Sequence, residues 1–106
     1  MTKIYFIGTF SSQGVKGLMT SNTDRVAVVK KTCDTIGVNF VSYDIVQGPF
    51  DFVAVVEGAA EQAIAMKGVV SMSGDFDQVH LCTSVSLETI RNNVKKIMSA
   101  YSPPSG

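Results

Sequence analysis

The chain has 106 residues, of which 45% are hydrophobic and 17% charged, and nine basic and nine acidic residues give a formal net charge of zero. This length fits one domain, and this hydrophobic content is typical of a globular protein rather than a disordered one. A neutral chain lacks the basic surface of proteins that bind nucleic acid or membrane surfaces, and it carries little charge repulsion against self-association.

The first third of the chain predicts a strand, a connection and a helix. Lys3–Phe10 is rich in β-branched and aromatic residues, which favour a strand. The polar connection over 11–22 is predicted to contain one helical turn in its middle. Ser21, with Asp24 three residues later, predicts the cap of a following helix, and Gly37 predicts its end. The apolar residues of that helix recur at helical spacing, at Val26, Val29, Cys33 and Ile36.

The rest of the chain predicts a hairpin, a helix, a strand and a last helix. In chain order these cover 38–46 (strand), 51–57 (strand), 59–67 (helix), 76–85 (strand) and 87–100 (helix). Gly48 and Pro49 favour a tight turn in the hairpin, Gly68 is expected to end the alanine-rich helix, and Ser86 caps the last one. A single domain over 1–101 is therefore expected, followed by a flexible tail over 102–106.

The order of these elements is β-α-β-β-α-β with an additional C-terminal helix. This predicts an α+β fold of the ferredoxin-like, split βαβ type. We expect right-handed crossovers to place the first and third strands, parallel to each other, at the centre of an antiparallel sheet. Both crossover helices then cover the same face of that sheet.

Both central strands are apolar on both of their faces, which favours an oligomer. Ile4, Phe6 and Phe10 oppose Tyr5 and Ile7 in the first strand, and Phe52, Ala54 and Val56 oppose Val53 and Val55 in the third. Two helices cover only one face, and an apolar patch of this size is rare on monomers. The simplest cover is the same face of a second copy, in a homodimer from which higher oligomers can be built.

The last helix is the alternative cover for that face. Its apolar stripe consists of Leu87, Ile90, Val94, Ile97 and Tyr101. If this helix folded back over its own sheet, the argument for a partner would be lost.

The turn Gly48-Pro49-Phe50-Asp51 resembles the signature of the GYD domain family, named for a Gly-x-Tyr-Asp-like turn that opens the third strand. The first strand and the following Gln13-Gly14 are similar to that family's N-terminal strand and Gln-Gly loop. The likeness covers 3–89, with the last helix beyond the family's core. It implies a dimeric α/β barrel without an assigned activity. Phe50 replaces the family tyrosine, so any role of that hydroxyl does not transfer to this chain.

The same Gly-x-x-Asp hairpin is more weakly similar to the effector-binding domains of Lrp/AsnC regulators. That resemblance implies an oligomer that binds small molecules between its subunits. Asp51 itself has two interpretations. Either its carboxylate accepts backbone N–H groups and fixes the turn, or it lies at the mouth of a cavity between subunits.

The fourth strand carries a polar face with the only histidine. Gln78, His80, Cys82 and Ser84 alternate with Val79, Leu81, Thr83 and Val85, and the polar set is expected to point between the two sheets of a dimer. His80 is either a hydrogen-bonded interface residue or a residue that binds a ligand or transfers a proton. Tyr43 and Asp44 face opposite ways, and whichever points inward adds a polar group to that space.

No metal or other cofactor is expected. His80 and Cys82, two residues apart on one side of a strand, suit two ligands of one metal, but no second histidine completes a structural zinc site. Cys33 and Cys82 are interpreted as reduced thiols, with a disulfide as the alternative. We find no secretory signal and no apolar run long enough to cross a bilayer, so a cytoplasmic location is expected.

The sequence therefore favours an oligomeric module that binds or regulates through an unidentified small molecule, without nucleic acid or membrane partners. One alternative is a small cofactor-free enzyme of the dimeric α/β-barrel class, an isomerase, decarboxylase or monooxygenase with His80 as base. The other alternative is a structural or assembly protein. These functional expectations rest on likeness of fold, which does not by itself determine function.

Overall fold

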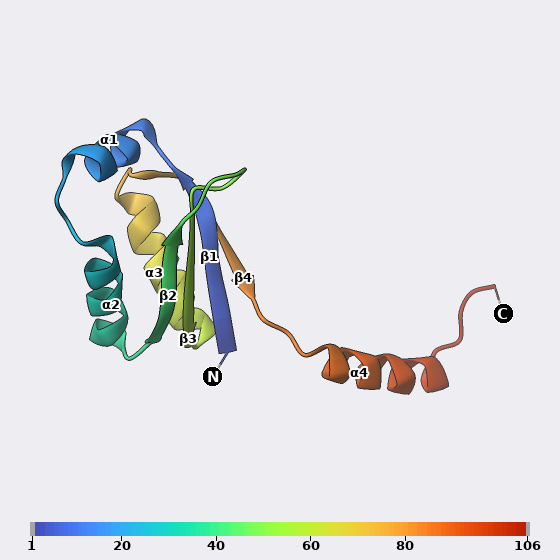
Figure 1. The fold of residues 1–106 in the computed structure, drawn as a ribbon. Coiled ribbons are helices and arrows are strands. Elements are labelled where there is room, and N and C mark those ends of the chain that lie inside the picture. The colour runs from blue at the N-terminus through green and yellow to red at the C-terminus, as the bar shows by residue number, and fades with distance from the viewer. Residues whose placement is uncertain (1, 106) are drawn as a thin grey trace.

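The computed structural model describes residues 2–105, and Figure 1 shows their arrangement. The elements are β1 (Thr2–Phe10), α1 (Ser12–Thr20), α2 (Arg25–Ile36), β2 (Asn39–Ile45), β3 (Phe52–Gly58), α3 (Ala60–Met72), β4 (Phe76–Thr83) and α4 (Leu87–Ala100). The four strands form one sheet in the order β2-β3-β1-β4, with every neighbouring pair antiparallel. This is an α+β architecture with the ferredoxin-like strand order.

The predicted parallel pairing of the two central strands is wrong. β1 and β3 do lie side by side at the centre, but they run antiparallel, with Ile4 opposite Val56 and Phe6 opposite Ala54. The reason is the β2–β3 hairpin, which reverses the chain. The crossover through α2 makes β1 parallel to β2, and β3 lies between them.

Two helices are longer than the sequence predicts. The expected single turn within 11–22 is the nine-residue helix α1. The expected stop at Gly68 is wrong, because α3 continues to Met72 and ends before Gly74, whose φ of 79° lies in the left-handed region. Gly68 is exposed, and its helical backbone costs only about 1 kcal/mol relative to alanine, so neighbouring helix-forming residues continue the helix across it.

The ends of α2 confirm one prediction and correct another. Gly37 ends the helix with a φ of 74°, as predicted. The N-terminal cap is Asp24, whose Oδ1 accepts a hydrogen bond from the Ala27 N–H at 3.1 Å. Ser21, the predicted cap, instead accepts from the Thr23 N–H at 3.0 Å within the preceding loop.

The core lies between the helices and one face of the sheet. α1, α2 and α3 all lie on that side in Figure 1. The buried hydrophobic residues are Ile4, Phe6, Phe10, Cys33, Val38, Phe52, Ala54, Val56 and Ala63. These include the predicted inward sets of β1 and β3, so the expected division of both strands into two faces is confirmed.

The last helix does not cover the other face. α4 projects away from the sheet in Figure 1, and the molecule measures 63 × 30 × 23 Å. Its whole predicted stripe is exposed, including Ile97 at 61% and Leu87 at 58%. The alternative in which α4 folds back over its own sheet is therefore wrong. Within residues 2–105, no helix has the length and apolar character needed to cross a membrane.

Candidate functional site

The open sheet face is the side of the sheet turned away from α1, α2 and α3. At its centre lie Tyr5 and Ile7 of β1, opposite Val55 and Val53 of β3. All four side chains are half-buried by their neighbours in the sheet. The two edge strands add polar groups on either side, namely Asn39, Ser42 and Asp44 of β2 and Gln78, His80 and Cys82 of β4. The face thus has an apolar centre between two polar edges.

Three predicted site residues lie together on β4. His80 pairs with Ile7, and Gln78 and Cys82 flank it on the same face. The His80 Nε2 lies 3.4 Å from the Gln78 Oε1. The ring of Phe50, the residue that replaces the family tyrosine, meets the His80 ring edge to face with centroids 5.9 Å apart. These groups can donate and accept hydrogen bonds beside an apolar surface.

Asp44 lies on the open sheet face at the opposite edge. It pairs with Val53, in the same cross-strand row as Ile7 and His80. Three strand spacings separate the two ends of this row, roughly 14 Å. Asp44 and His80 therefore make no contact within one subunit.

Tyr43 lies on the helix-covered face, away from the other predicted site residues. It pairs with Ala54, and its ring stacks on Phe52 with centroids 6.3 Å apart. Its hydroxyl is buried and has no hydrogen-bond partner among the described residues. Burial raises the pKa of Tyr43, while the nearby Arg25 guanidinium acts in the opposite direction.

Asp51 fixes the end of the sheet. Its Oδ2 accepts a hydrogen bond from the Phe10 N–H at 3.0 Å. Its own N–H donates to the Gly8 carbonyl at 2.8 Å, and its carbonyl accepts from the Val46 N–H at 2.9 Å. These bonds are those expected of a carboxylate that fixes a turn. Phe50, the residue before Asp51, is the one whose ring contacts His80.

The Gln13-Gly14 pair, which resembles the family's Gln-Gly loop, joins α1 to the turn before β4. The Gln13 Nε2 donates to the Asp75 Oδ1 at 2.8 Å. A Cβ atom on Gly14 would collide with the Asp75 carbonyl, so only glycine allows this close approach. The pair therefore has a packing role in this fold.

Both cysteines are free thiols. Cys33 is buried on α2, and burial, together with the charge of Asp34, raises its pKa. Cys82 is exposed on the open sheet face, on the other side of the sheet, so the alternative of a disulfide between them does not fit this fold. Among residues 2–105, no group of three or more histidine, cysteine or acidic side chains is close enough to hold a metal ion.

The helix side holds a cavity that the sequence did not predict. This α2–α3 cleft has a volume of about 310 Å³ and lies between α2, α3 and the sheet. Its lining is mostly apolar, and its polar members are Arg25, Thr32, Tyr43, Ser73 and Asp75. The sequence places Arg25 among the polar residues of an amphipathic helix, and nothing in that pattern shows that it is half-buried beside a tyrosine.

Comparisons with known proteins support the fold. The family model described as the GYD domain matches residues 5–94, most of the chain and part of α4, which was expected to lie beyond the family's core. A solved structure described as "crystal structure of FFRP-DM1" is similar, with a TM-score of 0.51 and 9% identity, over 80% of this chain and 100% of that one. This low identity makes the likeness one of fold alone. No curated protein matches the chain significantly.

Proposed function

We propose that this chain, which belongs to the GYD domain family, is an oligomeric module that binds a small molecule between two copies of its open sheet face. The observation that carries the proposal is an apolar sheet centre that none of the helices within residues 2–105 covers. A cytoplasmic location is part of the proposal, because two free cysteines suit a reducing compartment.

The distribution of residues on the open sheet face supports a homodimer. Stable interfaces have an apolar, desolvated centre and a polar, hydrated rim. Tyr5, Ile7, Val53 and Val55 match such a centre, and the outward residues of β2 and β4 match such a rim. In a dimer with a two-fold axis, the same surface of each subunit faces its partner. Each of these apolar side chains therefore contributes to the interface twice, once from each subunit.

The β4 edge supports ligand binding over catalysis. His80, Gln78 and Cys82 offer hydrogen-bonding groups, and Phe50 offers an aromatic surface beside them. A general base is normally held by a second group that orients it, often a carboxylate. The polar contact of His80 in this subunit is the Gln78 amide, and the Asp51 carboxylate bonds to the backbone of Phe10. A polar rim of this kind suits recognition of a small polar molecule.

Light scattering coupled to size exclusion tests the oligomer. At micromolar concentration the chain is expected to elute with at least twice its mass of 11.3 kDa. Ile7→Lys, which puts a charge in the centre of the contact, is expected to weaken dimerisation by more than about 100-fold. Ile64→Lys is the matched control, because Ile64 is exposed on α3, away from the sheet. A monomeric wild type, or equal effects of both variants, would contradict the proposal.

A small-molecule screen by thermal shift tests the binding function. A molecule that binds the native state raises Tm in proportion to its saturation. Compounds that raise Tm are then measured on His80→Ala and on Thr83→Ala, a control on the other face of the same strand. The proposal expects the first variant to lose binding and the second to keep it. Compounds that bind both variants equally would place the ligand elsewhere.

A further inference from the structure

We propose that the α2–α3 cleft is a second, separate binding site, for a monocarboxylic acid with an aliphatic or aromatic body. The cleft lies on the helix side of the sheet, opposite the open sheet face. It is complete within one subunit, so this proposal does not depend on the dimer. It rests on three features of the cleft: its apolar walls, its donor groups and the single carboxylate in its lining.

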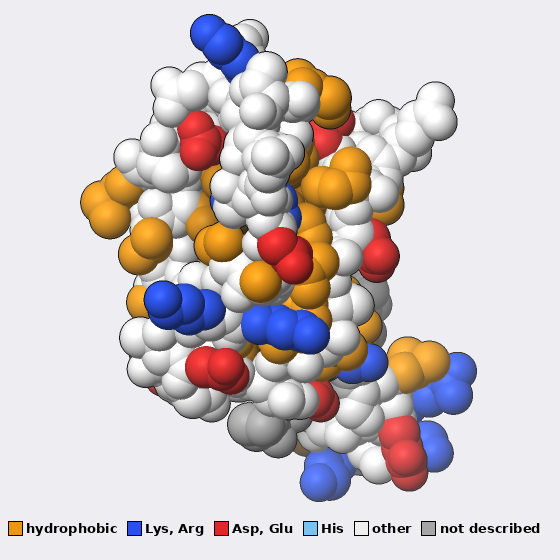
Figure 2. Space-filling model, turned by 60° about the vertical axis from the view of Figure 1, so that its left-hand side comes forward, with side chains coloured by type: hydrophobic (Ala, Val, Ile, Leu, Met, Phe, Trp, Pro, Cys, Tyr) orange, Lys and Arg blue, Asp and Glu red, His pale blue; other side chains and the backbone are white. Residues whose placement is uncertain are grey.

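The walls form an apolar chamber of about 310 Å³, near the lower end of the usual range for small-molecule pockets. Val28 and Val29 of α2 face Met66, Val69 and Val70 of α3 across it. Val28 is 40% exposed and Val69 is 60% exposed, although both lie on the helix-covered side. Figure 2, seen with this side turned forward, shows apolar side chains at the surface between polar ones. An apolar occupant would remove this surface from water.

The polar groups on the helix side point to an acid. Arg25 carries five N–H donors and no acceptor, and a tyrosine oxygen that faces a guanidinium can accept from it while its own O–H remains free to donate to an occupant. The Tyr43 hydroxyl is in this position, since it is buried, near Arg25 and without a hydrogen-bond partner among residues 2–105. The lining also contains the Thr32 and Ser73 hydroxyls and the Asp75 carboxylate, but Arg25 is its cation. Arg25 and the Tyr43 O–H together favour an occupant that brings oxygen acceptors with negative charge. A carboxylate supplies both, and it matches the fork of the guanidinium.

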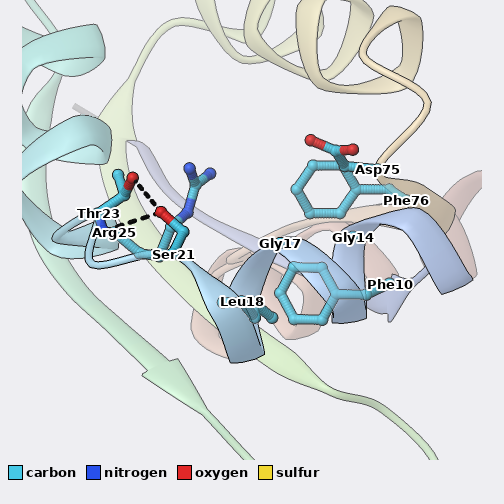
Figure 3. Close-up of a pocket in the computed structure, with 9 residues that line it drawn as sticks. All are labelled: Phe10, Gly14, Gly17, Leu18, Ser21, Thr23, Arg25, Asp75 and Phe76. Atoms are coloured by element: carbon cyan, nitrogen blue, oxygen red, sulfur yellow. Dashed lines mark hydrogen bonds between the residues drawn. The ribbon is translucent and has the colours of Figure 1, made fainter.

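An acidic side chain at one end of the cleft disfavours a second negative charge on the occupant. A smaller pocket of about 130 Å³ shares Arg25, Asp75 and Phe76 with the cleft. In Figure 3 the Arg25 guanidinium extends into this pocket from one side, without a hydrogen bond to the other residues drawn, and Asp75 lies on the other side. The Asp75 carboxylate is held by Gln13 and repels a second anionic group. The site therefore favours a monocarboxylate over a dicarboxylate or a phosphate.

Titration of the full-length chain with octanoate, followed by amide and methyl NMR shifts, tests the site. 1-Octanol serves as the neutral probe of equal chain length, and octylamine as the cationic one. Octanoate is expected to shift signals of Arg25, Tyr43 and Val69 and to bind at least about tenfold more tightly than 1-octanol, because a charge-assisted hydrogen bond is added. Octylamine is expected to bind more weakly than either.

Two pairs of variants test separately how the Arg25 charge and the apolar chamber contribute to binding. Arg25→Gln is expected to abolish the preference for octanoate over 1-octanol, whereas Lys31→Gln, an exposed charge on the same helix, keeps it. Val69→Trp fills the chamber and is expected to weaken both probes by at least about tenfold. Ile64→Trp is its control, exposed to a similar degree on α3 but outside the cleft.

Three results would overturn the proposal. Octanoate shifts confined to the open sheet face or to α4 would show binding to other apolar surfaces. Equal affinity for octanoate and 1-octanol in the wild type would remove the role of Arg25. Unchanged binding in a folded Val69→Trp variant would show that the chamber is not the site. None of these results bears on dimerisation, and a monomeric Ile7→Lys variant is still expected to bind octanoate.

Discussion

Among single residues, the buried Tyr43 hydroxyl and the two glycines of α1 lead to the clearest predictions about stability. A buried hydroxyl without a partner costs roughly 1–3 kcal/mol of folding free energy, so natural proteins seldom retain one without a use. The Tyr43 hydroxyl lies in such a position beside Arg25. Gly14 and Gly17 belong to the same helix, but only Gly14 lies against another segment.

Replacing Tyr43 by phenylalanine is expected to leave the free energy of unfolding at neutral pH unchanged or to raise it by up to about 1 kcal/mol. Because burial raises the pKa of Tyr43 above its ordinary value of 10.0, the folded state holds this proton more tightly than the unfolded state. Its contribution to stability is full below about pH 10 and is lost as the pH rises through the folded pKa. Tyr43→Phe is therefore expected to reduce the alkaline loss of stability.

Urea unfolding at about pH 8 and about pH 10.5 measures both effects, since this range spans the ordinary tyrosine pKa. Tyr101→Phe, at an exposed tyrosine, is the matched control. A Tyr43→Phe variant that is clearly less stable than the wild type at neutral pH would show that the hydroxyl has a partner in the folded protein. The account of the cleft would then lose one of its two donors.

The two glycines of α1 are expected to respond in opposite directions to alanine. Gly14→Ala forces a Cβ atom against the Asp75 carbonyl and is expected to destabilise the fold by more than about 1 kcal/mol. Gly17 has no atom near its Cβ position, so Gly17→Ala is expected to stabilise it by up to about 1 kcal/mol, through helix propensity. Thermal unfolding of both variants checks this, and equal effects would contradict the docking of α1 against the turn before β4.

Among the elements, α2 and α4 differ in how much each helix packs against the rest of the fold. Both begin with a side-chain cap, Asp24 for α2 and Ser86 for α4. α2 packs on the sheet and buries Cys33, whereas none of the residues of α4 is buried. An isolated helix of this length is marginal in water, because most helical stability in proteins comes from packing. The same loss of a cap should therefore have different consequences in the two helices.

Asp24→Ala is expected to lower the global free energy of unfolding by about 1 kcal/mol, because α2 folds with the core. Ser86→Ala is expected to lower helix content at α4 while leaving the global transition within about 0.5 kcal/mol of the wild type. Urea unfolding measures the global free energy of unfolding, and carbon chemical shifts of residues 87–100 measure the helix content of α4. If Ser86→Ala lowered global stability as much as Asp24→Ala, α4 would have to pack on the folded core.

The sequence predicts the elements whose pattern is regular and misses those that depend on local exceptions. The faces of β1 and β3 follow from strict alternation. The side of Tyr43 does not, because a register shift between Phe40 and Ser42 places both Phe40 and Tyr43 on the helix-covered face. The half-buried position of Arg25 depends on the packing of α2 over that shifted strand, which no helical pattern records.

The candidate site residues follow the same rule. Gln78, His80 and Cys82 lie on one face because β4 alternates regularly through them. Their separation from Asp44 follows from the strand order, since β2 and β4 are the two edges of the sheet. That order depends on long-range pairing, and the sequence carries it only through the β-α-β-β-α-β pattern.

At the scale of the whole molecule, a single subunit is less compact than its length implies. Its radius of gyration is 18.3 Å, whereas a compact chain of this length would have about 13 Å. The excess comes from α4, which extends from the β4 edge with its apolar stripe exposed (Figure 1). The open sheet face and the apolar stripe of α4 are both unpartnered in one subunit, and we propose that the open sheet face is the surface that pairs with a second copy.

An isotope-filtered NOE experiment on an equal mixture of ¹³C-labelled and unlabelled chains distinguishes between these two surfaces. Intermolecular NOEs are expected from the methyl groups of Ile7, Val53 and Val55, because these side chains lie at the centre of the open sheet face. Intermolecular NOEs restricted to the methyl groups of α4, with none from the sheet, would contradict the proposal.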